Sequence, residues 1–497
     1  MQPAATRRRP RPKPAWLAPK VLRTELLAGL VVALALIPEA ISFSIIAGVD
    51  PRVGLFASFT MAVSIAFLGG RPAMISAATG AIALVIAPLV ASHGLDHLLA
   101  TVILGGLLQV ALGLAGVARL MRFIPRSVMV GFVNALAILI FAAQLPYLDD
   151  VPWTVYVIFA AAIAVMVFLP RLTSAVPAPL VAIVALTALT LAVGWDVPDV
   201  GAQGELPDTL PFLLLPDVPL TLDTLRIIAP YAFAMALVGL MESLMTAKLV
   251  DDITDTHSDK TRESWGQGAA NIITGFFGGM GGCAMIGQTL INVKASGART
   301  RLSTFTAGIL ILVLAVGLGD IVALIPMGAL AAVMVMVAVA TFDWHSVHPA
   351  TLKRIPKSET TVMVSTVAVV VATHNLAIGV IVGVIVAALL FARRVAHLVE
   401  VTTVMDPDGD TRIYAVTGEL FFASSNDLVY QFDYNCDRRN VIIDLSDAHI
   451  WDASTVAALD AITTKYEARG KSVEIVGLNR ASAAMHARLA GHLSGSH

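Results

Sequence analysis

The feature that most constrains this chain is its series of apolar runs, each about as long as a helix that crosses a membrane. A helix needs about 20 apolar residues to span roughly 30 Å of hydrocarbon. Such runs extend from Leu26 to Ala47 and over 53–68, 75–92, 97–116, 123–145, 152–169, 176–194, 226–249, 263–279, 282–293, 302–319, 321–342, 360–374 and 376–397. Of the 497 residues, 57% are hydrophobic and 14% are charged, whereas soluble domains have about 25% charged residues. We therefore expect a polytopic α-helical membrane protein with 14 transmembrane segments.

The distribution of Lys and Arg supports this count. Basic residues gather in the loops of one side, including 119–126, 260–262, 294–301 and 353–357, whereas the other side has only Arg52 and Arg226. Cytoplasmic loops carry the excess of positive charge. The pattern predicts an integral inner (cell) membrane protein, multi-pass, with both termini in the cytoplasm.

Two of the predicted spans are short and broken. They are the third, ISAATGAIALVIAP, and the tenth, CAMIGQTLINVKA, and the tenth overlaps GGMGGCAMIGQTL (278–290), which contains five glycines. If the spans form inverted repeats of seven, at about 23–195 and 225–397, the two breaks occupy matching positions. Hydrocarbon does not tolerate unpaired backbone, and matched broken helices are a recurrent feature of transporters. The alternative is that the glycines serve only close helix packing.

The two ends of the chain differ in composition from the spans. Residues 1–22 are basic and proline-rich, which is typical of a disordered cytoplasmic tail, and 23–397 form the transport domain. Residues 398–497 alternate β-branched runs with helical ones, which predicts a small cytosolic α/β domain. The two cysteines, Cys283 and Cys436, show no disulfide or metal-site pattern.

Three stretches resemble a known family. ALIPEAISFSIIAGVDPRVGLFASF (35–59) and GGCAMIGQTLINVKASGARTRLS (281–303) are similar to the corresponding helices of sulfate permease (SulP) anion transporters. NVIIDLSDAHIWDAST (440–455) resembles the STAS domain that these transporters carry on their cytoplasmic side. The resemblance covers nearly the whole chain.

The resemblance implies a membrane domain of 7+7 inverted repeats, divided into core and gate subdomains and often dimeric. Such proteins move sulfate, bicarbonate, chloride or dicarboxylates. The sequence leaves open the oligomeric state and whether the STAS-like domain has a cytosolic partner. One position departs from the family. Regulated relatives have Ser directly after the motif Asp, but here Asp452 is followed by Ala453 and then Ser454, so phosphorylation at that site is unsupported.

An anion at the bilayer centre requires compensation, and the N-terminus of a helix supplies free N–H groups and a partial charge of about +0.5. The candidate substrate-binding residues therefore lie where the two broken spans begin. They are Ser76, Ala77, Ala78, Thr79 and Gly80 in the third span and Ala284, Met285, Ile286, Gly287 and Gln288 in the tenth. The Gln288 amide is either a substrate donor or a hydrogen bond between helices. No Lys or Arg lies in the middle of a span, which favours binding of modest affinity.

Two carboxylates within predicted spans are candidates for proton coupling. Glu39 in the first span and Glu242 in the eighth occupy equivalent places in the two repeats. Ionisable groups at this depth are usually functional; the structural alternative is a protonated acid in an interhelical hydrogen bond. The resembled family often has Gln where this chain has Glu39. A protonated Glu39 would donate to the anion, so the proton and the anion would travel together.

These patterns predict a secondary active transporter of small anions that works by proton-coupled symport and alternating access. The alternatives are a nucleobase–proton symporter of the same architecture and a membrane anion sensor that signals through the STAS-like domain. The chain has no P-loop, nucleophile–base pattern or metal-ligand cluster. We therefore expect no enzyme activity, no cofactor and no nucleic-acid partner. The patterns leave open which anion is carried.

Overall fold

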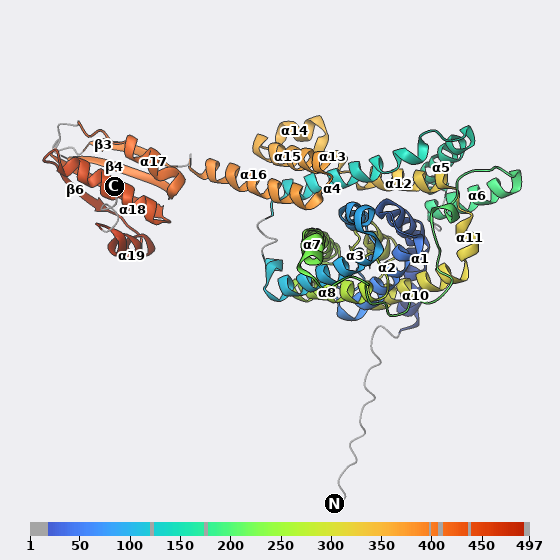
Figure 1. The fold of residues 1–497 in the computed structure, drawn as a ribbon. Helices are drawn as coiled ribbons and strands as arrows, with labels where there is room; N and C mark the ends of the chain where they lie inside the picture. Colours follow the sequence, from blue (N-terminus) through green and yellow to red (C-terminus); the bar gives the residue numbers. More distant parts are fainter. Residues whose placement is uncertain are drawn as a thin grey trace, which may run out of the picture. The chain divides into compact units, whose positions relative to one another are not determined.

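The chain divides into two compact units, Met1–Val384 and Ile385–His497, in a computed structural model (Figure 1). The structure describes residues 18–119, 124–172, 177–396, 399–405, 411–435 and 439–491. Within these ranges, 7 helices are long and apolar enough to cross a membrane, and three apolar helices are shorter. These helices agree with a polytopic α-helical protein, and the number of spans remains a prediction. Cys436 lies outside the described residues.

One group of helices, which we call the core group, surrounds the two broken spans. It consists of α1 (Pro19–Ala47), α2 (Pro51–Leu68), β1 (Ser76–Ala77), α3 (Gly80–Leu114), α7 (Leu222–Thr254), α8 (Lys260–Phe276), β2 (Cys283–Ala284), α9 (Ile286–Leu290), the π-helical turn η5 (Ile291–Ala295) and α10 (Arg301–Gly317). Helix α3 packs against α7 and α8, and α10 packs against α1 and α2. The core group thus joins elements from both halves of the sequence.

A second group, which we call the gate group, lies beside the first in Figure 1. It contains α4 (Arg126–Ala142), η3 (Leu145–Leu148), α5 (Trp153–Leu172), α6 (Ala178–Val193), η4 (Gly201–Gln203), α11 (Gly319–Ala323), α12 (Met327–Thr341), α13 (Trp344–Val347), α14 (Pro349–Arg354), α15 (Lys357–Thr373) and the first part of α16 (Leu376–Ala396). Helix α4 packs against α12 and α15, and α5 packs against α6 and α12. These helices also come from both halves of the chain.

One element boundary differs from the expectation. Helix α1 begins at Pro19, so the last part of the expected tail at 1–22 is helical, because proline suits the first turn of a helix; residues 1–17 lie outside the described range. The third and fourth apolar runs correspond to the two helical parts of α3, which meet at a kink where Gly94 is non-helical, with φ of 79°. Glycine adopts this left-handed conformation without steric cost.

The second unit contains a sheet covered by helices. Its strands are β3 (Glu400–Met405), β4 (Thr411–Leu420), β5 (Asn440–Ile450) and β6 (Ser472–Val476), in the order β3-β4-β5-β6. Strand β3 is antiparallel to β4, and β4, β5 and β6 are parallel. Its helices are α17 (Phe422–Tyr430), α18 (Ala453–Glu467) and α19 (Arg480–Leu489). Asp452 caps α18 by accepting the N–H of Thr455 at 3.1 Å.

The broken spans meet in a short antiparallel strand pair inside the core group. Ser76 pairs with Ala284, and Ala77 pairs with Cys283. Glycines make this approach possible. A Cβ on Gly282 would lie 2.0 Å from the carbonyl oxygen of Ala77, and Gly281 has φ of +77°. The glycine-rich stretch therefore serves both close backbone contact and irregular conformation.

Side chains of neighbouring helices satisfy the irregular backbone. Asn271 of α8 accepts the N–H of Gly282 at 2.8 Å and donates to its carbonyl at 3.0 Å. The Ser243 hydroxyl of α7 accepts the N–H of Ala284 at 3.1 Å. The Thr289 hydroxyl accepts the N–H of Ile75 at 3.0 Å. These bonds replace the water that hydrocarbon does not supply.

The double hydrogen bond of Asn271 leads to the first prediction. Asn271→Ala leaves the N–H and C=O of buried Gly282 without partners, which should destabilise the protein by about 3 kcal/mol. A thermal melt of the purified chain should show a clearly lower melting temperature. Ile273→Ala, at a side chain 36% exposed on the same helix, is the control. Equal melting temperatures for the two variants would contradict the assigned role of Asn271.

The second prediction concerns the core of the C-terminal unit. Leu459 of α18 is 0% exposed and packs with Tyr414 and Ile443 of the sheet. Leu459→Ala should lower the free energy of unfolding by about 3 kcal/mol because it creates a cavity. Urea unfolding of residues 399–497, produced alone, measures this change, with exposed Thr464→Ala as the control. A segment that shows no cooperative unfolding would show that this unit depends on the membrane unit.

Candidate functional site

Two helices begin directly after the strand pair. In α3, the Thr79 hydroxyl accepts the N–H of Ile82 at 3.4 Å, and the first backbone bond runs from Ala83 N–H to Thr79 O. In α9, the first bond runs from Thr289 N–H to Met285 O, and no side chain caps the helix. The first N–H groups of each helix precede its first internal bond. They supply donors and positive potential at the centre of the core group.

The start of α9 is the more open of the two. Gly287 is exposed, and a Cβ built on it would meet no atom within 4 Å. At the start of α3, a Cβ on Gly80 would lie 2.8 Å from the Phe43 ring. A small ligand therefore has space at Gly287, where it reaches the backbone of α9.

Glu39 lies at this open turn. The Gln288 side chain donates from Nε2 to Glu39 Oε1 at 3.0 Å. The other amide atom, Gln288 Oε1, is buried and has no hydrogen-bond partner among the described residues. Glu39 belongs to the first half of the sequence and α9 to the second. The contact thus places a carboxyl group from one half beside the broken helix of the other.

Glu242 shows the reverse arrangement: it comes from the second half of the sequence and lies near the start of α3, which belongs to the first half. Its Oε2 accepts from the Cys283 thiol at 2.9 Å, and the Cys283 sulfur lies 3.2 Å from the Thr79 hydroxyl. Thr79 caps α3, so a chain of three side chains connects Glu242 to the start of that helix. Glu242 is 7% exposed, and the Cys283 thiol links its carboxyl group to Thr79 of the α3 cap.

The other predicted site residues belong to the strand pair and its flanks. The Ser76 hydroxyl accepts from Gln267 Nε2 at 2.7 Å, and the Ala78 N–H reaches the Ser58 hydroxyl at 3.4 Å. Ser76, Ala77, Ala78 and Ala284 are each 0% exposed, and Met285 donates its N–H to Ile75 O. Ile286 is half-buried beside Gly287. The predicted residues therefore lie together, with the open space confined to the start of α9.

Several polar residues that surround the strand pair were not predicted from the sequence to belong to the site. The sequence favours packing or capping for Asn271 and shows no disulfide or metal-site pattern for Cys283. Ser243 and Gln267 were not singled out. The available signal was the concentration of polar residues in the spans at 226–249 and 263–279, which is costly in lipid unless each has a partner.

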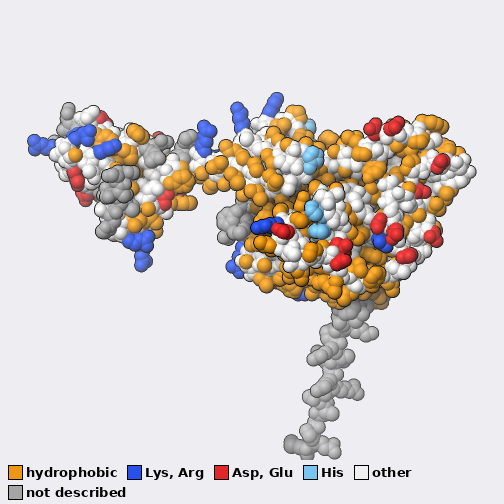
Figure 2. All heavy atoms as spheres, in the orientation of Figure 1, with side chains coloured by type: hydrophobic (Ala, Val, Ile, Leu, Met, Phe, Trp, Pro, Cys, Tyr) orange, Lys and Arg blue, Asp and Glu red, His pale blue; other side chains and the backbone are white. Residues whose placement is uncertain are grey.

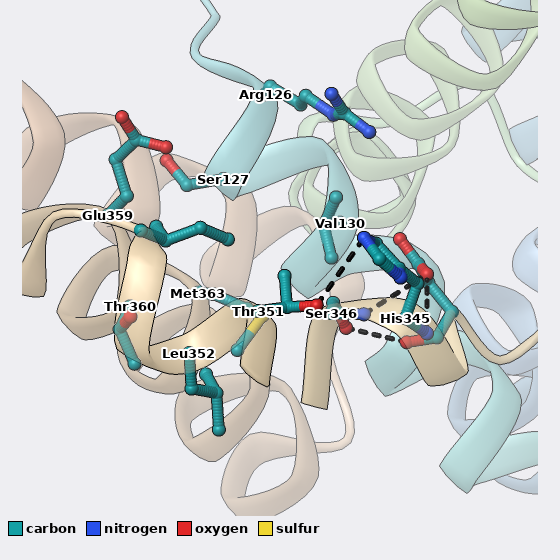
Figure 3. A pocket seen from close by; sticks show the side chains of 12 residues that line it. Arg126, Ser127, Val130, His345, Ser346, Thr351, Leu352, Glu359, Thr360 and Met363 are labelled. Atoms are coloured by element: carbon teal, nitrogen blue, oxygen red, sulfur yellow. Dashed lines mark hydrogen bonds between the residues drawn. The ribbon is translucent and has the colours of Figure 1, made fainter. Parts of the chain in front are cut away.

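The gate group contains a separate hollow that is lined in part by charged side chains (Figure 3). Its volume is about 280 Å³, and its lining includes Arg126, Asp343, His345 and Glu359. Figure 3 shows hydrogen bonds at one end of the hollow, including one between His345 Nε2 and the Thr351 hydroxyl at 3.4 Å. None of the predicted substrate-binding residues lines this hollow, so it is separate from the broken helices.

Comparisons with known proteins identify relatives along nearly the whole chain. The model of the "Sulfate permease family" matches residues 22–165 and 147–366, and the model of the "STAS domain" matches residues 403–494. "Putative sulfate transporter YbaR" of Bacillus subtilis (strain 168) is 53% identical over 94% of this chain and 97% of its own length. "Bicarbonate transporter BicA" of Synechocystis is 27% identical over 92% of this chain and 88% of its own length. These relatives are named as transporters, not as enzymes.

Solved structures share the fold. The transmembrane domain of a cyanobacterial bicarbonate transporter BicA, at 25% identity, covers 75% of this chain and 98% of its own, with a TM-score of 0.64. The murine Solute Carrier 26 family member A9 anion transporter, at 18% identity, covers 95% of this chain and 89% of its own, with a TM-score of 0.80. With the two family models and the 53% identical relative, this likeness leads to one conclusion. The chain belongs to the sulfate permease family and carries a C-terminal STAS domain.

Proposed function

We propose that this protein carries a small anion of the sulfate, bicarbonate or dicarboxylate class across the membrane by alternating access, in symport with protons. The observation that supports this proposal most strongly is the open first turn of α9 beside Glu39. There, exposed Gly287 leaves the backbone accessible, and the Glu39 carboxyl accepts from the Gln288 amide at 3.0 Å. Free N–H groups and a titratable group thus share one place.

The charges at this place favour an anion held with modest affinity. The hydrogen bonds of Glu39, Gln288, Glu242 and Thr79 within the described residues involve no Lys or Arg. Helix ends therefore supply the positive potential, and each is equivalent to about half an elementary charge. A site without a fixed cation releases its anion readily, which suits transport better than permanent capture.

Proton coupling follows from the position of Glu39. An ionised carboxylate at the open turn would repel an incoming anion, whereas a protonated carboxyl group would donate a hydrogen bond to it. Proton and anion would therefore bind cooperatively, and each would raise the affinity for the other by the same factor. An inward proton gradient would then drive anion accumulation. Glu242, which reaches the start of α3 through Cys283, is the alternative proton carrier.

The remaining assignments belong to the same proposal. The names of the relatives, a sulfate transporter and a bicarbonate transporter, favour these two anions over dicarboxylates. We place the protein in the inner (cell) membrane with both termini cytoplasmic, because Lys and Arg gather in the loops of one side. A homodimer and a cytosolic partner of the STAS domain are further parts of this proposal.

The third prediction tests the open turn of α9. Gly287→Phe should abolish anion uptake into proteoliposomes while the protein still folds, because the ring would enter the empty space beside the helix start. Gly317→Phe is the matched control, since a Cβ on Gly317 also meets no atom within 4 Å and this residue lies at the far end of α10. Unchanged uptake by Gly287→Phe would place the anion elsewhere.

The fourth prediction concerns Glu39. Glu39→Gln keeps an acceptor for Gln288 but removes the proton, so uptake driven by an inward pH gradient should fall to the rate measured without a gradient. Uptake of labelled sulfate and bicarbonate, each with and without the pH gradient, measures this difference. Exchange of anions between the two sides should persist.

Two further variants serve as a control and as a test of the alternative proton carrier. Glu359→Gln, at an exposed residue of the gate group, should behave like the unmodified protein. Full pH-driven accumulation by Glu39→Gln, together with its loss in Glu242→Gln, would assign the proton to Glu242. The proposed transport would be wrong if the unmodified protein and all the variants bound the anion but did not move it across the membrane.

A further inference from the structure

An apolar groove lies between the end of α2 and the start of α10, outside the site described above. Its volume is about 620 Å³, and its apolar lining includes Phe67, Pro72, Leu302 and Phe305. The rings of Phe67 and Phe305 meet edge to face with centroids 5.8 Å apart, and Phe67 is 65% exposed. α2 ends and α10 begins here, so the span assignment predicted from the sequence puts the groove at the membrane boundary.

Arginine side chains border this groove. Arg299 and Arg301 line it directly, and Arg262 donates to the carbonyl oxygens of Phe67 and Leu68 at 2.9 and 3.1 Å. Arg301 donates to the carbonyl oxygens of Ala66 and Gly69 at 3.2 and 2.6 Å. These carbonyls belong to the last turn of α2, where a helix leaves acceptors without internal partners.

Two buried carboxylates offset part of the positive charge of this border: Glu25 accepts the backbone N–H of Arg299 at 2.7 Å, and Glu263 attracts the Arg301 guanidinium. Among the described residues, no carboxylate lies within ion-pair distance of Arg262, Arg299 or Arg301. Arg299 is exposed, and its side chain donates from Nη1 to the carbonyls of Val293 and Ala298. A guanidinium has five donors, so Arg299 retains donors for a ligand.

We propose that this groove binds an anionic phospholipid. The acyl chain would lie on Phe67, Leu302 and Phe305, and the phosphate would contact Arg299 and Arg301. Exposed apolar surface next to basic side chains at a membrane boundary matches both parts of such a lipid. A free phosphate would use the arginines alone and leave the apolar groove empty, so the shape of the groove favours the lipid.

A lipid bound in this groove would stabilise the packing of the core group. The groove spans α2 and α10, which pack against each other, and Arg301 already ties the start of α10 to the end of α2. A lipid that contacts both helices would stabilise the folded state, because any ligand that binds only the folded protein does so.

The test measures lipid binding to the purified full-length chain, with no dependence on transport. Short-chain phosphatidylglycerol and phosphatidylcholine are titrated separately, and both the melting temperature and the lipid-bound fraction by native mass spectrometry are recorded. Phosphatidylglycerol should bind more tightly and raise the melting temperature more. Arg299→Gln should weaken phosphatidylglycerol binding about fivefold and leave phosphatidylcholine binding unchanged, while Arg354→Gln, an exposed residue of α14, should change neither.

Further arms separate the lipid from other occupants. Phe67→Ser removes part of the apolar lining and should weaken binding of both lipids without changing the charge. Inorganic phosphate should neither raise the melting temperature nor displace phosphatidylglycerol. The proposal is wrong if the two lipids bind equally well, if Arg299→Gln binds phosphatidylglycerol like the unmodified protein, or if inorganic phosphate displaces the lipid, which would indicate a free-anion site.

Discussion

The backbone pairing between Ser76–Ala77 and Cys283–Ala284 is the interaction on which the transport unit depends. Each partner interrupts a helix inside an apolar environment, and neither interruption is tolerable alone because its N–H and C=O groups would be unpaired. The strand pairing satisfies some of these backbone groups. The side chains of Asn271, Ser243 and Thr289 form hydrogen bonds with others. The two halves of the chain are therefore joined at the place where both are least regular.

This pairing also determines the electrostatics of the site. It puts the starts of α3 and α9 in the same region, so that free N–H groups of both helices supply positive potential without a basic side chain. Each start is associated with a carboxyl group of the opposite half: Glu39 contacts Gln288 in α9, and Glu242 connects to Thr79 through Cys283. The arrangement combines acidic groups and an anion-attracting backbone, which is the basis of the proposed coupling.

At the ends of the core-group helices, charged side chains bind the free backbone groups. Arg262 and Arg301 bind the last carbonyls of α2, and Glu25 of α1 accepts the N–H groups of Arg299 and Thr300 before α10. The end of α2 and the start of α10 are thus each capped by side chains whose charge is opposite to that of the helix dipole at that end. Arg299 and the exposed Phe67 ring line the same groove there, and hydrophobic side chains are widespread on the visible face of the helical unit (Figure 2).

Local patterns in the sequence were enough to predict the membrane class, the two broken spans and a small C-terminal α/β domain, because hydropathy, glycine content and β-branched runs act over short stretches. The STAS assignment came from the resemblance of residues 440–455 to that family. The local patterns also pointed to Glu39 and Glu242 as unusual. Which groups meet was decided only by the tertiary structure. Cys283 lies between Glu242 and Thr79, and Gln288 contacts Glu39 from 249 positions away. Such contacts depend on how the two halves pack, and no local pattern specifies that packing.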